Sequence, residues 1–195
     1  MSASAQPKQD GRVARRTGTR EAIMDAATEL FAARGVTSTS IDDIAAAAGI
    51  AKGSIYYNFE SKAGLVEEIM ARNSELMAAA LRSATRGRTG PDLRDEVVRA
   101  LLRLVQEHAA AAQVMVTELF RTERSWREAI ARWRGLALSP LIDDLRASGA
   151  EGVVADVQAA AIVGATLMAG LEWLVFHPER SYDQVIAAVL GTLAR

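Results

Sequence analysis

The sequence predicts an all-α protein with two helical domains, and three observations support this fold class. Hydrophobic residues make up 50% of the chain but aromatic residues only 5%, and the chain contains only four prolines. This composition, based on Ala, Leu, Val and Ile, favours helices. Apolar residues recur every three or four positions in most segments, which is the period of a helix. No segment shows the strict alternation of apolar and polar residues expected of a half-buried strand.

The first segment is basic. It carries a net charge of +4 within residues 1–20, so the remaining residues sum to −5 and the whole chain to −1. Residues 1–18 are expected to form a disordered arm. Such an arm is either a solvated tail or a segment that contacts phosphates. The charged residues of this segment are Lys8, Asp10, Arg12, Arg15, Arg16 and Arg20.

Several absences indicate the compartment. The first residues contain no apolar core of a secretory signal, and the chain has no cysteine for disulfides or thiolate metal sites. The longest apolar run, residues 157–171, is shorter than the roughly 20 residues that a membrane span requires. We therefore expect a cytoplasmic protein without a membrane partner, and read the apolar run as a buried helix.

Residues 19–34 are predicted to form the first helix. Ile23, Ala27 and Phe31 lie on one stripe of this segment, and Gly35 follows where a helix-terminating glycine belongs. A short second helix begins after Ser40, a favourable N-cap, with Asp43 in the position of the acidic partner of a capping box. Gly49 ends that helix after about two turns.

The stretch "IAAAAGIAKGSIYYNF", residues 44–59, combines the features of a helix-turn-helix. Two short helices pack at a steep angle when a small residue, a glycine in the turn and a branched apolar residue meet. Ala45, Gly49 and Ile55 satisfy these requirements. In this motif the second helix enters the major groove of DNA. The alternative is a helical hairpin whose tyrosines only cap a core. Gly53 would let the backbone come close to the duplex. The residues expected on the outward face are Lys52, Ser54, Tyr56, Tyr57 and Asn58.

The remaining chain is predicted to be helical as well. Ser61 is a plausible cap for a long helix over residues 62–85, and the glycines and proline of residues 86–92 indicate a junction. The segments that follow predict one or two helices over 93–122, one interrupted near Pro140 over 125–150, one over 153–177 and a last one over 181–194.

Residues 19–70 closely resemble the DNA-binding domain of the TetR (tetracycline-repressor-like) family, through "AA..LF...G", "S.DDIA..AG..KGS.YY.F" and "SK..L". The resemblance implies a DNA-binding domain over 19–65 and a ligand-binding and dimerisation domain over 66–195. It implies phosphate contacts for Thr39, Ser40 and Lys62. Position 58 departs from the family, because Asn replaces the usual His and offers only an uncharged hydrogen bond. The residues that the resemblance assigns to the recognition helix are Lys52, Gly53, Ser54, Tyr56 and Tyr57.

The helix over 153–176 is apolar on nearly every face, so it must be covered on all sides. Its own domain covers one side, and a four-helix contact with the same helices of a second copy would cover the rest. The alternative is that both C-terminal helices belong to the monomer core. The residues expected in a dimer interface are Gly164, Leu167, Leu171, Leu174, Val185 and Val189.

A small-molecule sensor also requires a cavity. Flat or adaptable side chains line such cavities, although they serve equally well in core packing. Arg121 and Arg124 could contact an acidic group of a ligand, or could be solvated. The residues expected to line the pocket are Met115, Leu119, Phe120, Trp126, Trp133, Met168 and Trp173.

An enzyme is the competing class of protein. His108 and His177 lie far apart in sequence, and neither aspartate pair, 42–43 or 143–144, has a third carboxylate at metal-binding spacing. We therefore expect no catalytic residue, metal or cofactor. A helical protein-interaction module without DNA binding is a second alternative. The family resemblance favours a homodimeric repressor that leaves a palindromic operator in double-stranded DNA when a small apolar or amphipathic molecule binds.

Overall fold

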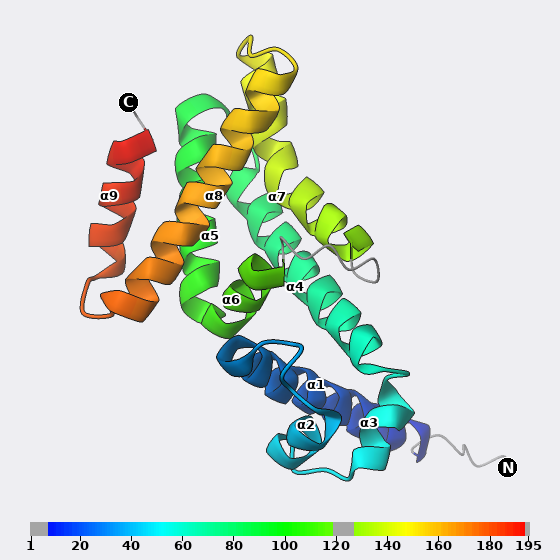
Figure 1. Ribbon diagram of the computed structural model, residues 1–195. Coiled ribbons are helices and arrows are strands. Elements are labelled where there is room, and N and C mark those ends of the chain that lie inside the picture. The colour runs from blue at the N-terminus through cyan, green and yellow to red at the C-terminus, as the bar shows by residue number, and fades with distance from the viewer. Residues whose placement is uncertain (1–7, 119–126, 194–195) are drawn as a thin grey trace, which may run out of the picture. The chain divides into compact units, whose positions relative to one another are not determined.

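The computed structural model describes residues 8–118 and 127–193, and helices are the only regular secondary structure in those ranges (Figure 1). The all-α prediction is confirmed. Residue contacts divide the chain into two compact units, one up to Ile69 and the other from Met70 onward. The helices are α1 (Lys8–Arg34), α2 (Ile41–Ala47), α3 (Lys52–Asn58), α4 (Lys62–Thr85), α5 (Gly90–Glu107), α6 (Ala109–Glu118), α7 (Arg127–Ala147), α8 (Val153–Phe176) and α9 (Tyr182–Leu193).

The first unit contains α1, α2, α3 and the first two turns of α4. Its core forms where the apolar stripes of these helices meet, because each helix is too short or too polar to hold its conformation alone. The expected stripe of α1 is buried as predicted, and α1 packs against α2. The buried apolar residues of this unit are Ile23, Met24, Ala27, Phe31, Val36, Ile44, Ala45, Ile55, Phe59, Leu65, Val66 and Ile69.

Helix α1 begins at Lys8, well before the expected start at residue 19. Residues 8–18, which composition predicts to be part of a disordered arm, therefore extend this helix. Extending an existing helix adds one hydrogen bond for each residue that is ordered, whereas nucleating a new one is costly. The segment contains Gly11 and Gly18 but no proline, so nothing in it blocks the extension.

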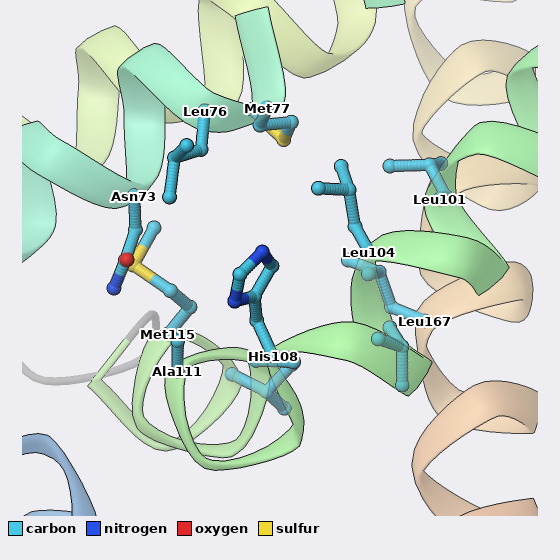
Figure 2. Close-up of a pocket in the computed structure, with 12 residues that line it drawn as sticks. Asn73, Leu76, Met77, Leu101, Leu104, His108, Ala111, Met115 and Leu167 are labelled. Atoms are coloured by element: carbon cyan, nitrogen blue, oxygen red, sulfur yellow. The ribbon is translucent and has the colours of Figure 1, made fainter. Parts of the chain in front are cut away.

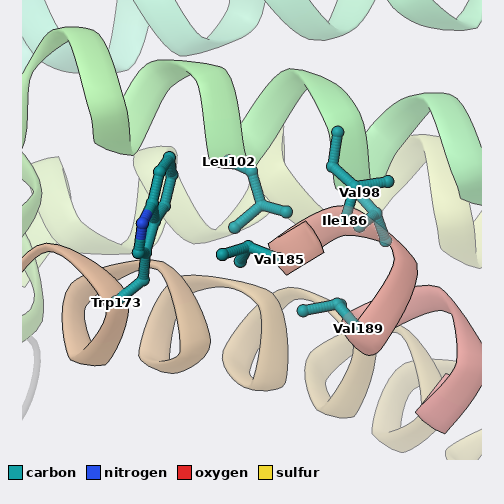
Figure 3. Close-up of a cluster of buried hydrophobic side chains, with 6 residues drawn as sticks. All are labelled: Val98, Leu102, Trp173, Val185, Ile186 and Val189. Carbon is teal, nitrogen blue, oxygen red and sulfur yellow. The ribbon is translucent and has the colours of Figure 1, made fainter. Parts of the chain in front are cut away.

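The second unit is a bundle in which α8 packs against both α5 and α7, and α9 packs against α5 and α8. Gly170 makes the closest approach: a Cβ atom on it would lie 3.0 Å from Cγ1 of Val105 and 3.2 Å from Cδ2 of Leu102. Figure 3 shows one part of the core, where side chains from α5, α8 and α9 converge. This cluster consists of Val98, Leu102, Trp173, Val185, Ile186 and Val189.

Two details of the second unit were open or differ from expectation. Helices α5 and α6 are separate, because His108 leaves the helical conformation at φ −135° and ψ 49°. The predicted interruption near Pro140 is wrong, since α7 runs through this proline. Proline removes one backbone hydrogen bond from a helix. Burial of the flanking Leu138 and Leu141, with α7 packed on α8, offsets that loss.

Helix α8 is apolar enough and long enough to cross a membrane by composition alone, a property that core helices of water-soluble proteins share. Within the bundle it is covered on one side only. Its other side carries an exposed stripe at helical spacing, on which Val157, Met168 and Val175 are each 59% exposed and Phe176 is 70% exposed. We define the exposed stripe of α8 as Val157, Ala161, Gly164, Ala165, Met168, Val175 and Phe176.

Candidate nucleic-acid interface and ligand cavity

The segment from α2 to α3 has the geometry of a helix-turn-helix. Ser40 caps α2 through the predicted capping box: its Oγ accepts a hydrogen bond from the Asp43 backbone N–H, and the Asp43 carboxylate accepts one from the Ser40 N–H. Gly49 occupies the turn at φ +66°, a conformation that side-chain-bearing residues rarely adopt. Ile55 is 1% exposed and is the buried residue of α3, which packs against α2. Ala45, the small residue expected on α2, is 5% exposed, so Ala45, Gly49 and Ile55 all meet the requirements predicted for the motif.

The outward face of α3 presents aromatic rings and a cation to solvent. Tyr56 is 53% exposed and Tyr57 is 74% exposed. Lys52 and Gly53 are also exposed, and a Cβ on Gly53 would meet no atom within 4 Å. A helix with one buried anchor and this face toward solvent can enter the major groove, where base edges and thymine methyls are accessible.

Lys52 pairs with Asp42, with 2.9 Å between Nζ and Oδ2. The hydrogen bond that Nζ donates to the Asp42 carboxylate raises the pKa of Lys52 above its usual value of 10.5, so the ammonium stays charged at neutral pH. Both side chains are exposed, and exposed ion pairs are weak. The ammonium group can therefore exchange this carboxylate for a phosphate at little cost.

Two residues expected to contact DNA turn toward their own domain instead. Thr39 is 1% exposed, and its Oγ1 donates to the Gly35 carbonyl oxygen at 2.9 Å. Asn58 Nδ2 donates to the Ser54 carbonyl oxygen at 2.7 Å, which closes the last turn of α3. Ser54 is half-buried. The side chains of Thr39 and Asn58 thus stabilise the motif.

Lys62, also expected to contact phosphate, donates from Nζ to backbone oxygens of the loop before α2. The distances are 2.9 Å to the carbonyl oxygen of Val36, 3.4 Å to that of Thr37 and 3.0 Å to that of Thr39. An ammonium group has three donors, and all three point to this loop. Lys62 therefore fixes the approach to α2 from the start of α4.

Arg20 also contacts the motif, although the sequence placed it only among the charges of the basic N-terminal segment. Its guanidinium donates to the Asn58 carbonyl oxygen at 2.6 Å, pairs with the Glu68 carboxylate and lies 4.4 Å from the centroid of the Phe59 ring. A cation at the C-terminus of a helix is favourable, because the last carbonyl oxygens lack partners. The spacing of Arg20 to Ile23 and Ala27 on one helix was the available signal.

The second unit contains a cavity between α4, α5, α6 and α8 (Figure 2). Its empty volume is about 490 Å³ including the open mouth, and the centre of a water-sized sphere can occupy about 60 Å³ of it. Its wall is apolar except for Asn73 and His108. The lining residues are Asn73, Leu76, Met77, Leu101, Leu104, Val105, His108, Ala111, Ala112, Met115, Val116 and Leu167.

Of the residues expected in a pocket, Met115 lines this cavity. Met168 is 59% exposed on the stripe of α8, and Trp173 is 4% exposed in the core cluster, where it also borders a separate hollow between α8 and α9. Leu119, Phe120 and Trp126, with Arg121 and Arg124, lie outside the described residues. Trp133 belongs to α7, and its side chain lies outside the description.

The residues expected in a dimer interface have several locations. Gly164 is exposed, as expected, and Leu171 is half-buried. Leu167 lines the cavity. Val185 and Val189 belong to the core cluster, and Leu174 packs against it. The inward face of α9 thus packs within the chain itself, and the exposed stripe of α8 carries the unpartnered apolar surface.

His177 and Asp144, which were considered as catalytic groups, contact other residues of the chain. His177 lies 3.6 Å from Glu172 and 3.4 Å from Glu179, and the Asp144 carboxylate accepts a hydrogen bond from the Gly90 N–H at the start of α5. Within the described ranges, no three His, Asp or Glu side chains gather as they would around a metal ion.

Comparison with known proteins identifies the N-terminal segment. Residues 23–69 match the family model of bacterial regulatory proteins, tetR family. Over 55 residues the chain is 47% identical to the transcriptional repressor KstR2 of Rhodococcus jostii strain RHA1, covering 28% of this chain and 27% of that protein. The chain therefore spans about a quarter of the length of this curated relative.

Solved structures match over nearly the whole chain. A bacterial regulatory protein in the tetR family from Rhodococcus RHA1 is 22% identical with a TM-score of 0.77, covering 90% of this chain and 94% of that one. AibR, solved with isovaleryl coenzyme A and operator DNA, is 20% identical with a TM-score of 0.73, covering 89% and 97%. At this identity the likeness establishes the fold of both domains.

Proposed function

We propose that the whole chain is a ligand-responsive transcriptional regulator that binds DNA, starting from the match of residues 23–69 to the family model of bacterial regulatory proteins, tetR family. The observation that carries the proposal is the face of α3. A helix anchored by Ile55, with Tyr56 and Tyr57 exposed beside Lys52 and Gly53, has the form of a major-groove reader.

Each exposed group of α3 has a role in this proposal. Lys52 neutralises a phosphate and exchanges its pairing with Asp42 for it, which makes binding dependent on salt. Tyr56 and Tyr57 contact base edges or thymine methyls. Gly53 allows the backbone to approach the duplex closely. Ser40, at the start of α2, lies where such motifs contact the phosphate backbone.

We propose that the chain acts as a homodimer joined through the exposed stripe of α8. The stripe combines bulky residues with Gly164 and two alanines, so a second copy of α8 can approach closely. The exposed face of α9, with Ala187, Ala188 and Gly191, can border the same contact. A two-fold dimer presents two α3 helices, and this geometry matches a palindromic operator with half-sites one helical turn apart.

The effector in this proposal is a small apolar or amphipathic molecule bound in the cavity of the second unit. The structural neighbour AibR was solved with isovaleryl coenzyme A, which has a short apolar acyl group. Helix α4 lines the cavity with Asn73 and begins at Lys62 in the DNA-binding unit. A ligand that shifts α4 would disfavour DNA binding, with a reciprocal coupling of about 1–3 kcal/mol. We propose that the chain is cytoplasmic and that it represses transcription when it is bound to DNA.

The first test is selection of bound fragments from sheared genomic DNA of the source organism with the purified protein, at low and near-physiological salt. Enrichment of a short palindrome that survives the higher salt supports a sequence-specific dimer. Recovery of fragments without a shared sequence at both salt concentrations would contradict the proposal.

Substitution of Tyr56 tests the placement of the recognition helix. Tyr56→Ala is expected to weaken binding to the selected palindrome by about 1–3 kcal/mol and to leave non-specific binding unchanged, because the ring contacts bases. Fluorescence anisotropy with specific and scrambled duplexes measures both affinities. Lys52→Ala is the comparison, and should weaken both duplexes alike and reduce the salt slope by about one. Unchanged palindrome affinity for Tyr56→Ala would exclude this placement of α3.

A further inference from the structure

The wall of the cavity in the second unit is apolar apart from two side chains. Asn73 comes from α4 and His108 from the corner between α5 and α6, and Figure 2 shows both among the apolar lining, with Met115 beside Asn73. In a cavity of this composition, a few polar groups determine the orientation and identity of the ligand. The two residues are therefore the candidates for specificity.

The Nδ2 atom of Asn73 is fully buried, and among the described residues no acceptor lies within hydrogen-bond distance of it. A buried donor without a partner is costly, and a bound water or ligand can supply the missing acceptor. The terminal torsion of an asparagine side chain is broad, which lets the amide turn its two N–H donors toward the cavity.

His108 supplies the second polar group. It follows the last turn of α5, where its backbone leaves the helical conformation, and its imidazole ring projects among the lining residues (Figure 2). A neutral imidazole has one N–H donor and one acceptor nitrogen. Both polar side chains can thus donate a hydrogen bond, and a ligand that accepts one satisfies either of them.

We propose that this cavity selects apolar molecules that carry one hydrogen-bond acceptor, such as a ketone, ester or thioester carbonyl, held by Asn73 and His108. The apolar body of the ligand lies against the leucine and methionine side chains of α4, α5 and α6. The inference rests on the proposed ligand-responsive function, and it adds the chemical class of the effector and the residues that recognise it.

Two volatile probes of matched shape test this selection. 2-Octanone carries a carbonyl acceptor, and 2-methyl-1-octene replaces that oxygen by a methylene group and leaves the hydrocarbon chain unchanged. Headspace gas chromatography over solutions of the full chain measures the dissociation constant of each probe. The informative quantity is the ratio of the two constants in each variant, because the different hydration of the probes cancels between variants.

Asn73→Leu is expected to weaken 2-octanone relative to the alkene by about 10-fold, and His108→Leu should shift the ratio in the same direction. His108 is exposed at a helix end, so its substitution tests the proposal even where Asn73→Leu impairs folding. Gln113→Leu, which removes an exposed amide from α6, is the matched control and should leave the ratio unchanged. Ala111→Phe fills the cavity and should abolish binding of both probes.

Three outcomes would overturn the inference: neither probe binds the wild-type chain, Ala111→Phe leaves binding intact, or the ratio is unchanged in both the Asn73 and His108 variants. The genomic-DNA selection uses no ligand and is independent of these measurements. A chain that selects a palindrome but fails the probe tests retains its proposed DNA-binding function and loses only this ligand assignment. A chain that passes the probe tests but selects no DNA keeps this ligand assignment and loses the proposed DNA-binding function.

Discussion

Among single residues, Arg20 joins three elements of the N-terminal unit. One guanidinium contacts the last carbonyl of α3, the ring of Phe59 and the carboxylate of Glu68 on α4. Each contact alone stabilises the fold only modestly. Because all three involve the same side chain, the entropy cost of ordering that side chain is incurred once. Helix α3 has only one buried side chain, Ile55. The hydrogen bond from Arg20 to the last carbonyl of α3 therefore makes a large contribution to holding the helix in place.

Replacing Arg20 by methionine keeps most of the apolar stem and removes the guanidinium. The Arg20→Met variant is expected to unfold about 1–2 kcal/mol more readily, with faster amide exchange at Phe59, whose N–H closes the end of α3. Hydrogen exchange with mass spectrometry measures this. Glu67→Gln, beside Glu68 on α4, is the control for a charge change alone. Unaltered protection of α3 would show that Ile55 suffices.

The capping box of α2 gives the N-terminal unit an acid-sensitive contact. Hydrogen bonds from the Ser40 side chain and backbone lower the pKa of Asp43 below its usual value of 3.8. A lowered pKa in the folded state means that the contribution to stability is complete above pH 3.8 and is lost as the pH falls below it. Asp43→Asn should therefore reduce the loss of thermal stability between pH 5 and about pH 3. Equal losses in both proteins would contradict this role of the carboxylate.

Single residues also show where sequence reasoning is limited. Ser40, Gly49 and Ile55 were predictable because capping, positive φ and burial are local requirements that neighbouring residues reveal. The structural roles of Thr39 and Lys62 were not predictable. Their partners are backbone oxygens of a loop, and a carbonyl group has no signature in the sequence. The sequence does not distinguish a lysine that binds phosphate from one that donates hydrogen bonds to a loop.

At the scale of the helix, two glycines of α8 have opposite surroundings. A Cβ on Gly170 would press on Val105 and Leu102 of α5, whereas a Cβ on Gly164 would meet nothing within 4 Å. Gly170 therefore permits the close contact of α8 with α5. Gly164 lies on the exposed stripe, where within a single chain its small size has no packing consequence.

This contrast predicts opposite effects of the same substitution. Gly170→Ala should lower the free energy of unfolding by about 1–3 kcal/mol through overpacking. Gly164→Ala should leave it unchanged or raise it by up to about 1 kcal/mol, because alanine favours the helix. Urea unfolding at low protein concentration, where association is minimal, measures both. A Gly170→Ala variant as stable as Gly164→Ala would show that α5 and α8 separate at little cost.

Helix limits were predictable to different degrees for physical reasons. The start of α4 follows the Ser61 cap, whose Oγ accepts from the Gly64 N–H, so its position was visible in the sequence. The early start of α1 was not visible, because composition reports charge and not the cooperative gain of continuing a helix. Pro140 predicted a break, and only the burial of its neighbours shows why α7 continues.

For the whole molecule, the exposed stripe of α8 is the surface on which the proposed dimer rests. A surface with this many exposed valine, methionine and phenylalanine side chains is unusual for a monomer in water. The sequence predicted that α8 must be covered. It could not show which face the chain covers itself, because a helix that is apolar all round has no directional period. That is why Val185 and Val189 were expected in the dimer contact and lie in the core.

Association through the stripe predicts the effect of one charge at its centre. Met168→Glu should convert the protein to monomers at micromolar concentration, because two carboxylates would face each other across the two-fold axis. Sedimentation velocity measures this. Gln113→Glu, with its added charge on exposed α6, should remain dimeric. A Met168→Glu variant that sediments with the wild type would place the contact between copies on another surface.

The two ends of α3 are held unequally. At its carboxyl end, Arg20 and the Asn58 amide bind the last backbone oxygens, whereas at its amino end Ala51 provides no side-chain cap. The end that carries Lys52 and Gly53 is therefore the adjustable one. If α3 reads DNA as proposed, substitutions at that end can alter the preferred DNA sequence without disturbing the fold. The held end would then preserve the angle at which α3 enters the groove, so new binding specificities could arise in small steps.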